Sequence, residues 1–201
     1  EVLARGYEEV QEVYSREYAF ALARAADVEV TKAVQRALHE ALGKAPTVGG
    51  GAEELRAAAE IAGQDMRGWT ESYARTVYRT NMATAFSAGR FRAMADPEVQ
   101  ELIPALEFQA TLDSDVRPNH AALHGLVMAA DDPRWDVLSP PAGYNCRCVA
   151  VPVDAGTLRR RRLLTPDGRV VKQPTPAGGG PDPGFGRGRP DRAISGYSAA
   201  R

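Results

Sequence analysis

The chain has 201 residues, of which 44% are hydrophobic and 25% are charged, an ordinary balance for one soluble globular domain with appendages. No apolar run approaches the roughly 20 residues that cross a bilayer, and the acidic, amphipathic start does not resemble a signal peptide. Two cysteines are too few for a disulfide-stapled secreted scaffold, so we expect a reducing compartment. The first residue is Glu1 rather than Met, which suggests that the chain begins inside a longer one.

The net charge of −1 hides an uneven distribution of charged residues. Residues 1–154 carry a net charge of −8, whereas residues 155–201 carry +7. An acidic body therefore ends in a basic segment, and such a segment is suited to nucleic acid or to an acidic protein surface.

The first half of the chain is predicted to be helical. Apolar residues recur at spacings of three or four within residues 1–24 and again within 27–42, as on one face of a helix. The sequence PTVGGGA at 46–52 is interpreted as a linker. An alanine-rich helix is then expected over 52–63, followed by a long helix over 67–95.

The pattern changes near residue 105, where aromatic and β-branched residues predict a strand over 106–113. RPNHAALHG (117–125) predicts a short helix, because proline suits the first helical position and glycine the residue after the end. NCRCVAVPV (145–153) alternates as a strand does, and 158–172 predicts a short helix or strand, a turn and a further strand. From Gln173 onward proline and glycine dominate, so we expect no independent structure there, although a neighbour could order this tail.

We therefore predict an α+β chain in three parts. A helical region covers residues 1–104, and a small mixed α+β module that contains both cysteines covers residues 105–173. An extended, basic tail rich in proline and glycine covers residues 174–201.

Both cysteines and two of the three histidines form a candidate metal site. On a helix, His120 and His124 would lie on one face, as paired histidine ligands often do. In an extended segment, Cys146 and Cys148 would point to one side and Arg147 to the other. A disulfide between the two cysteines is not expected, because Cα atoms two residues apart in a strand stand about 6.5–7 Å from each other, at the limit of relaxed bridge geometry.

Two histidines and two cysteines are the ligand types of a structural zinc site. One residue between the cysteines is fewer than structural sites usually have. The alternative is a small module with a buried cysteine pair and a histidine packed on Trp135, and the sequence leaves both interpretations open. Four protein ligands would leave no position for water, which favours a structural over a catalytic zinc ion.

Two other features lie near this site. Asp113 and Asp115 could pair with Arg117 across a turn, and we favour this structural role over acid–base catalysis. SPPAGYN (139–145) predicts a rigid turn that presents Cys146, and a cis peptide bond before one of its prolines is compatible with such a turn.

Residues 159–162 are four consecutive arginines. On a helix they would spread around all faces, so a solvated turn is the simpler interpretation, and contact with a phosphate backbone is the functional one. The candidates for binding nucleic acid or a protein partner are Arg159, Arg160, Arg161, Arg162, Arg187 and Arg189.

The stretch from EFQATLDSDVRPNHAALHG (107–125) to DDPRWDVLSPPAGYNCRC (131–148) resembles the phage Mu protein F-like minor head protein family, also called phage head morphogenesis proteins. The family pattern is a strand ending in Thr and Asp, then Arg-Pro-x-His-x-x-Leu-x-Gly, an acidic-Trp segment and Pro-Pro-x-Gly-x-Asn-Cys-Arg-Cys. Residues 73–90 and PDPGF (181–185) also resemble the family. Many members carry other residues, often acidic, at the position of His124, so the resemblance favours the other three ligands.

The resemblance implies a structural, non-enzymatic protein of a tailed-phage virion or related particle, made in the bacterial cytoplasm and located in the head interior or at the portal vertex. It implies roles in head morphogenesis and in DNA packaging or ejection. The expected partners are the portal protein, the major capsid protein or other head and connector proteins, together with nonspecific DNA contact.

Two other functions stay open at this point. In a metal-dependent nuclease or toxin-like effector, His120 and the cysteines would hold a catalytic metal, and Asp113 or Asp115 would act as base. A cytosolic zinc-ribbon adaptor without any phage context would use the same residues to stabilise its fold.

Overall fold

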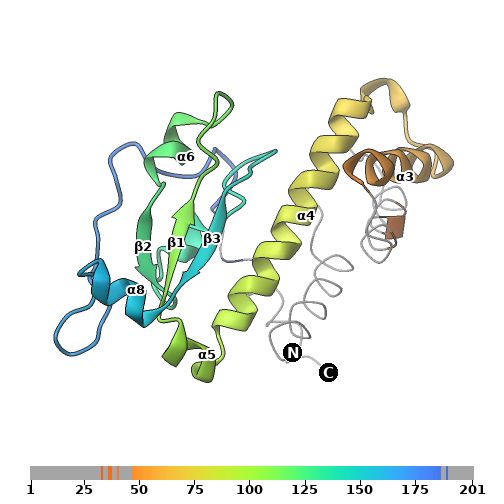
Figure 1. Ribbon diagram of the computed structural model, residues 1–201. Helices are drawn as coiled ribbons and strands as arrows, with labels where there is room; N and C mark the ends of the chain where they lie inside the picture. Colours follow the sequence, from red (N-terminus) through yellow and green to blue (C-terminus); the bar gives the residue numbers. More distant parts are fainter. Residues whose placement is uncertain (1–32, 34–35, 38–39, 41–46, 187–188, 190–201) are drawn as a thin grey trace.

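The computed structural model describes residues 33, 36, 37, 40, 47–186 and 189. Most of the two helices expected before residue 43 lies outside these residues. The fold is α+β, as predicted, and Figure 1 shows the long helix α4 between α3 and a small sheet. The elements in chain order are α3 (Val48–Ile61), the 3₁₀ helix η1 (Met66–Gly68), α4 (Glu71–Met94), α5 (Pro97–Leu102), β1 (Ala105–Gln109), α6 (Pro118–Ala122), β2 (Leu126–Ala129), α7 (Trp135–Leu138), β3 (Val149–Val153) and α8 (Ala155–Arg160). In this part of the chain, no helix combines the length and the apolar character that crossing a membrane requires.

Helix α3 begins at Val48, so the interpretation of residues 46–52 as a linker was wrong. Thr47 caps the helix, because its hydroxyl oxygen accepts a hydrogen bond from the N–H of Gly50 at 3.2 Å. Gly51 lies against α4 at a point where a Cβ would stand 2.4 Å from Cε2 of Tyr78. Glycine is needed here for close helix packing, which composition alone does not distinguish from a flexible linker.

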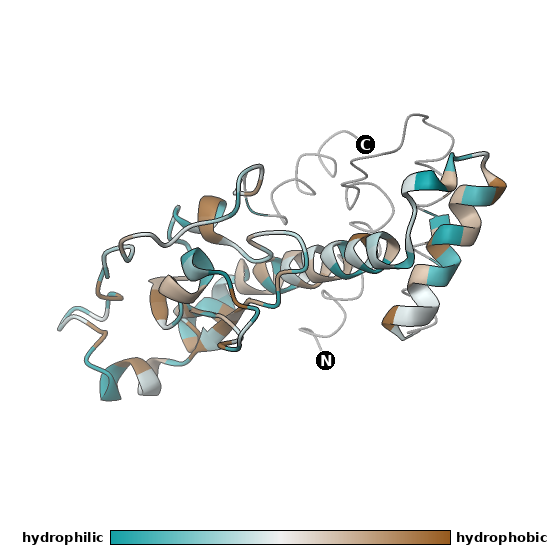
Figure 2. Cartoon of the chain, turned by 90° about the horizontal axis from the view of Figure 1, so that it is seen from above, coloured by the Kyte–Doolittle hydropathy of each residue, from teal (hydrophilic) through white to brown (hydrophobic). Residues whose placement is uncertain are grey.

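Helix α4 contributes to two separate hydrophobic cores. Near its start, Val77 and Tyr78 pack with Leu55 of α3. Near its end, Phe91 and Met94 pack against the sheet and α7. In Figure 2, α4 connects the α3 end of the chain with the sheet end, and its mostly pale colours match the small residues along it.

The sheet has three antiparallel strands in the order β2-β1-β3. The central strand β1 is buried on both faces: Phe108 belongs to the core shared with α4, and Ala105 packs with Leu158 of α8 on the other side. Glu107 also faces that second side, where Arg161 donates a hydrogen bond to its carboxylate. Apolar Leu106 and Phe108 therefore alternate with polar Glu107 and Gln109, so the side that α8 and Arg161 cover is the more polar one.

Two predicted strands are shorter in the structure than in the sequence pattern. β1 ends at Gln109, because the chain then turns, with the N–H of Asp113 donating to the carbonyl of Thr111. β3 begins only at Val149, because Asn145 has a left-handed backbone (φ 55°) that interrupts an extended chain. Both cysteines therefore lie in a loop before β3 rather than within the strand.

Residues 173–186, which we call the strap, contain no helix or strand but lie along the α+β module. At their start, the side-chain oxygen of Gln173 accepts a hydrogen bond from the N–H of Val127 at 2.8 Å. Near their end, Phe185 meets the ring of Tyr144 edge-on, with 5.0 Å between centroids. The described part of the tail thus has no regular structure of its own, and the module is the neighbour that orders it.

Candidate metal centre

The three firmest predicted ligands come from two elements that the sheet brings together. His120 lies on α6, which begins with Pro118 at its first position, as predicted. Cys146 and Cys148 lie on the loop before β3. The peptide bond between Pro140 and Pro141 in this loop is cis, which was one of the two positions considered.

Asn145 fixes the loop to α4. Its backbone N–H donates to the hydroxyl oxygen of Thr80 at 3.2 Å, and its side-chain amide donates to that of Thr76 at 2.9 Å. Asparagine tolerates the left-handed conformation that places these donors toward the helix. The cysteines on either side of Arg147 follow directly, so α4 sets their position.

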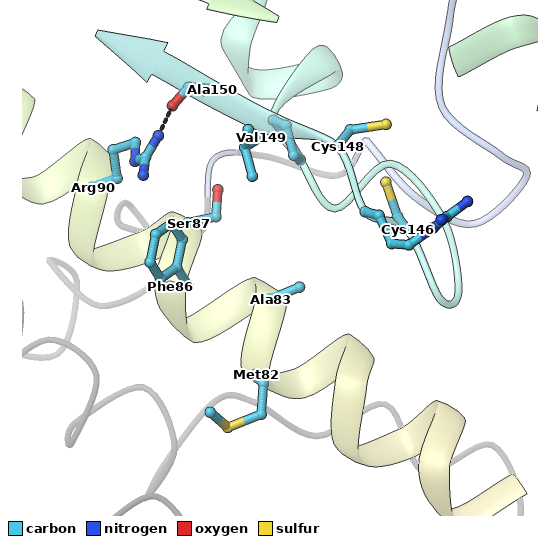
Figure 3. Close-up of a pocket in the computed structure, with 11 residues that line it drawn as sticks. Met82, Ala83, Phe86, Ser87, Arg90, Cys146, Cys148, Val149 and Ala150 are labelled. Atoms are coloured by element: carbon cyan, nitrogen blue, oxygen red, sulfur yellow. Dashed lines mark hydrogen bonds between the residues drawn. The ribbon is translucent and has the colours of Figure 1, made fainter. Parts of the chain in front are cut away.

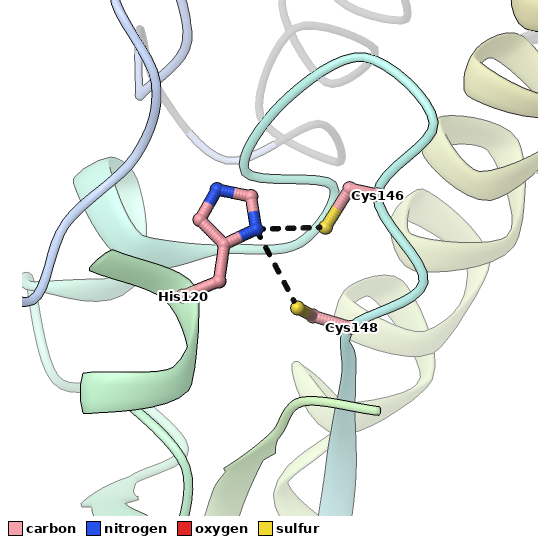
Figure 4. Close-up of side chains that lie close together, drawn as sticks. All are labelled: His120, Cys146 and Cys148. Carbon is pink, nitrogen blue, oxygen red and sulfur yellow. Dashed lines mark hydrogen bonds between the residues drawn. The ribbon is translucent and has the colours of Figure 1, made fainter. Parts of the chain in front are cut away.

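The structure brings His120, Cys146 and Cys148 together in a buried cluster (Figure 4). Nδ1 of His120 lies 3.7 Å from Sγ of Cys146 and 3.8 Å from Sγ of Cys148, and all three atoms lie within 4.8 Å of one another. Ligand atoms on a tetrahedral zinc ion are expected to stand about 3.6 Å apart for a sulfur and a nitrogen, given the usual bond lengths. The cluster therefore fits zinc in both donor type and spacing.

The two thiols are free rather than bridged, as predicted, and they strongly affect each other. A hydrogen bond from Cys148 lowers the pKa of the Cys146 thiol to about 6, although burial opposes this shift. The same hydrogen bond, together with burial, raises the pKa of Cys148. Near neutral pH the pair thus carries one thiolate and one retained proton, which a bound cation would displace.

His124 does not lie with the other three ligands, so its expected place in the site needs correction. The prediction assumed a helix over 117–125, but α6 ends at Ala122, and Gly125 has a left-handed backbone (φ 83°). The residue four positions after His120 is therefore past the helix and on a different side. His124 is exposed, and its Nδ1 accepts a hydrogen bond from the N–H of Ala110 at 3.2 Å.

A carboxylate on the strap, Asp182, faces the other nitrogen of His120, and the sequence analysis missed it. Nε2 of His120 lies 3.2 Å from Oδ1 of Asp182, close but not aligned as a hydrogen bond. Nε of Arg117 lies 3.1 Å from Oδ2, and the side-chain amide of Asn119 donates to Oδ1 at 3.2 Å. The available signal was the PDPGF segment, which matched the family pattern and carries this acid.

The expected pairing of Asp113 with Arg117 was wrong. Asp113 instead forms an ion pair with Arg147, whose Nη2 lies 2.7 Å from Oδ1, and this contact lowers the pKa of the carboxyl group. Arg147 thereby points away from the thiols, as predicted. Arg117 reaches Asp182 and also donates to the carbonyl of Tyr144 at 2.7 Å. Both arginines hold loops around the cluster in place.

Two hollows border the cysteine loop. A polar one of about 20 Å³ lies between the cluster and Thr111, Asp115 and Arg117, which is room for one water molecule. A larger, mostly apolar one of about 310 Å³ separates the loop from α4, with Phe86 beneath it and Arg90 bonded to the carbonyl of Ala150 (Figure 3). Among the described residues, three protein donors thus converge, and the polar hollow lies beside them.

The family described as Phage Mu protein F like protein matches residues 33–151, more than half of the chain. The chain belongs to this family. The matched segment contains α3, α4, the whole sheet apart from the last residues of β3, and all three donors of the cluster. It ends before the arginines at 159–162 and before the strap.

Two curated proteins are similar to the chain. The putative capsid assembly protein F of Escherichia phage Mu is 29% identical over 169 residues, which is 78% of this chain and 38% of that protein. The Mu-like prophage FluMu F protein of Haemophilus influenzae is 29% identical over 156 residues, which is 71% of this chain and 36% of that protein. The chain therefore spans little more than a third of the length of these relatives, and no solved structure matches it.

The arginines beyond the matched segment differ in their surroundings. Arg161 is bonded to Glu107, which ties it to the sheet. Arg189, expected at a binding surface, is instead 9% exposed and stacks over the ring of Phe91 at 5.1 Å. Arg187 lies outside the described residues. Arg159, Arg160, Arg161 and Arg162 are all exposed, but Arg161 is paired with Glu107.

Proposed function

We propose that this chain is a structural part of the head of a tailed phage or phage-like particle and acts in head assembly without catalysis. Its membership in the Phage Mu protein F like family carries the proposal, and the similar protein of Escherichia phage Mu is named a putative capsid assembly protein. Its partners would be the portal protein, the major capsid protein or other head and connector proteins. Its place would be the head interior or portal vertex of a virion assembled in the bacterial cytoplasm.

The proposal includes a structural zinc ion held by His120, Cys146 and Cys148. A zinc ion bound there would cross-link α6 to the loop before β3, two segments that no backbone ladder joins. Structural zinc sites add their binding free energy to folding. In a module whose sheet has only three short strands, such a cross-link would stabilise the arrangement that presents the surface to neighbours.

The proposal also includes a contact with packaged DNA through Arg159, Arg160 and Arg162. These side chains are exposed at the end of α8, within the positively charged last quarter of the sequence. Guanidinium groups bind phosphates without reading base sequence, as a nonspecific contact with packaged DNA requires.

Reconstitution with a phage portal protein tests the proposal. The purified chain is mixed with portal rings, and separately with short duplex DNA at low salt, and binding is followed by analytical ultracentrifugation. Stable comigration with the portal supports the assembly role. Absence of binding to both portal and DNA at low salt would contradict it.

A metal-dependent nuclease or toxin-like effector is the second candidate, and one observation favours it. The polar hollow beside the three donors has room for a water molecule and is lined by Asp115, which could act as a base. Cleavage of plasmid DNA or RNA that requires added zinc or manganese and disappears in His120→Ala would establish this alternative. We expect no cleavage by the wild-type chain.

A further inference from the structure

The imidazole of His120 lies between two different partners, the thiols on one side and a carboxylate on the other. We propose that Asp182 is a positioning residue of the metal centre, and that metal binding and docking of the strap stabilise each other. This inference rests on the zinc centre proposed above. It adds a function for the strap, which lies beyond the segment that matches the family.

The orientation of the ring is the first observation. Nδ1 faces Sγ of Cys146 and Cys148 (Figure 4). On the other side of the ring, Nε2 lies 3.2 Å from Oδ1 of Asp182. A histidine that binds a metal needs a lone pair on one nitrogen and carries its proton on the other. The carboxylate favours the tautomer with the proton on Nε2, which leaves the Nδ1 lone pair facing the thiols.

The second observation is that the carboxylate of Asp182 is itself held in place. Nε of Arg117 and the side-chain amide of Asn119 contact its two oxygens at 3.1 and 3.2 Å. Its own N–H donates to the carbonyl of Ala142 at 2.7 Å, in the loop that leads to the cysteines. The contacts therefore come from both segments that supply metal ligands, α6 and the cysteine loop.

The third observation is that the rest of the strap is attached at separate points. Asn119 makes two further hydrogen bonds to Gly180, with its carbonyl accepting at 3.3 Å and its side-chain amide donating at 3.0 Å. Beyond these, Phe185 packs edge-on against Tyr144, and Gly179 lies against Leu123. With the bonds of Gln173 to Val127 and Arg134, the strap is held at separate points rather than along a backbone ladder, so the loss of one point should loosen the strap locally.

These observations give a reciprocal relationship. If a docked Asp182 increases the affinity of the cluster for zinc, then bound zinc must favour the docked strap by the same factor. Loss of an outer carboxylate that orients a ligating histidine typically lowers metal affinity about 10–100-fold. Bound zinc is therefore expected to slow hydrogen exchange of the strap amides by the same factor.

The experiment uses the whole chain under reducing conditions, stripped of metal and titrated with zinc against a chromogenic chelator. Asp182→Asn keeps the size of the side chain and removes its charge, whereas Asp167→Asn makes the same change in an exposed turn. Hydrogen exchange of the strap amides is followed by mass spectrometry with and without zinc. The cobalt(II) spectrum shows whether both thiolates still bind the ion.

We expect Asp182→Asn to weaken zinc binding about 10–100-fold while the cobalt–thiolate bands persist, and Asp167→Asn to leave the affinity unchanged. Zinc should slow exchange of the Asp182 and Phe185 amides in the wild-type chain, but not in Cys148→Ser. If Asp182→Asn fails to fold, Phe185→Ala removes the packing against Tyr144 three residues further along the strap and should also weaken zinc binding.

Wild-type zinc affinity in Asp182→Asn, or strap exchange that zinc does not change, would overturn this inference and leave the zinc centre standing. A wild-type chain that binds no zinc would instead overturn the centre itself, and the inference with it. Neither result bears on binding to the portal, which the reconstitution measures separately.

Discussion

An oxygen of Asp182 occupies the space that a side chain on Gly143 would need, because a Cβ at that position would stand 2.1 Å from Oδ2. The same Cβ would come within 3.3 Å of Cε1 of His120. The cysteine loop thus leaves room for the carboxylate directly beside the histidine, and this room depends on the absence of a side chain.

Gly143→Ala should therefore push Asp182 away from His120. We expect the free energy of unfolding to fall by about 1–3 kcal/mol, the usual cost of overpacking, as measured by urea denaturation. Gly180→Ala is the matched control on the strap, since no atom lies within 4 Å of its Cβ. Equal stability of the two variants would show that the loop can give way without cost.

The contact between Gly51 and Tyr78 predicts opposite effects for two neighbouring glycines of α3. Gly51→Ala would bring a methyl group to 2.4 Å from the Tyr78 ring and should destabilise the chain by about 1–3 kcal/mol. Gly49→Ala makes only ordinary contacts, the nearest being 3.6 Å from Arg75 Nη2, and should stabilise the helix by roughly 0.5–1 kcal/mol. Thermal unfolding of both variants shows whether each substitution raises or lowers Tm relative to wild type. A Gly51→Ala variant as stable as wild type would argue against close packing of α3 on α4.

Elemental analysis should find about one zinc ion per chain. We expect the metal to be lost in Cys146→Ser, Cys148→Ser and His120→Ala, whose side chains form the cluster. His124→Ala should retain it, because that ring accepts a hydrogen bond from Ala110 instead. Chelation should lower Tm, since zinc at one hundred times its Kd adds about 2.7 kcal/mol to stability. Zinc loss in His124→Ala alone would refute this ligand set.

The ion pair of Asp132 with Arg134 predicts a dependence of stability on acid. Hydrogen bonds from Arg134 lower the pKa of Asp132, and Arg134 also donates to the carbonyl of Gln173 at 2.6 Å, where the strap begins. A folded-state pKa below the unfolded value means that the stabilisation is complete above about pH 4, the ordinary carboxyl pKa, and is lost as pH falls through the lowered value. By urea denaturation, the free energy of unfolding should therefore differ more between wild type and Asp132→Asn at pH 7 than at pH 3. The same difference in unfolding free energy at both pH values would contradict this prediction.

The exposed arginines at and just after the end of α8 predict how DNA binding responds to salt. Replacing Arg159, Arg160 and Arg162 by glutamine should lower the slope of log affinity against log salt by up to about 3, because each phosphate contact on duplex DNA contributes about 0.9. Arg67→Gln, at an exposed arginine of η1, is the control and should leave the slope unchanged. Fluorescence anisotropy of a labelled duplex measures the slope for both variants. A slope in the triple variant equal to that of the wild-type chain would exclude a role for these arginines.

The parts of the fold and site that could be predicted depend on local geometry. Periodicity identified α4, and the proline and glycine around His120 identified α6 as a short helix. The two cysteines and His120 could be grouped from residue type, since few other residues in the chain bind zinc strongly. The error over His124 followed from a helix that ends at Ala122, two residues earlier than the glycine at 125 suggests.

What could not be predicted depends on contacts between distant segments. Asp182 belongs to a stretch without helical or strand periodicity, so nothing local indicates which residue it faces. The glycines at 49–51 have the composition of a linker, and only the approach of Tyr78 shows that they form a helix. In both cases the decisive neighbour comes from another part of the chain.

The presence of α4 in two cores has a mechanical consequence. Its 24 residues form a rod about 36 Å long, clamped by α3 packing at one end and by Phe91 against Trp135, with ring centroids 5.4 Å apart, at the other. A fragment that begins at the predicted boundary, residue 105, would lose Phe91 and expose to solvent the face of the sheet that packs against α4. If the intact helix acts as a fixed spacer, a neighbour that binds α3 would move the cluster of His120, Cys146 and Cys148 together with it.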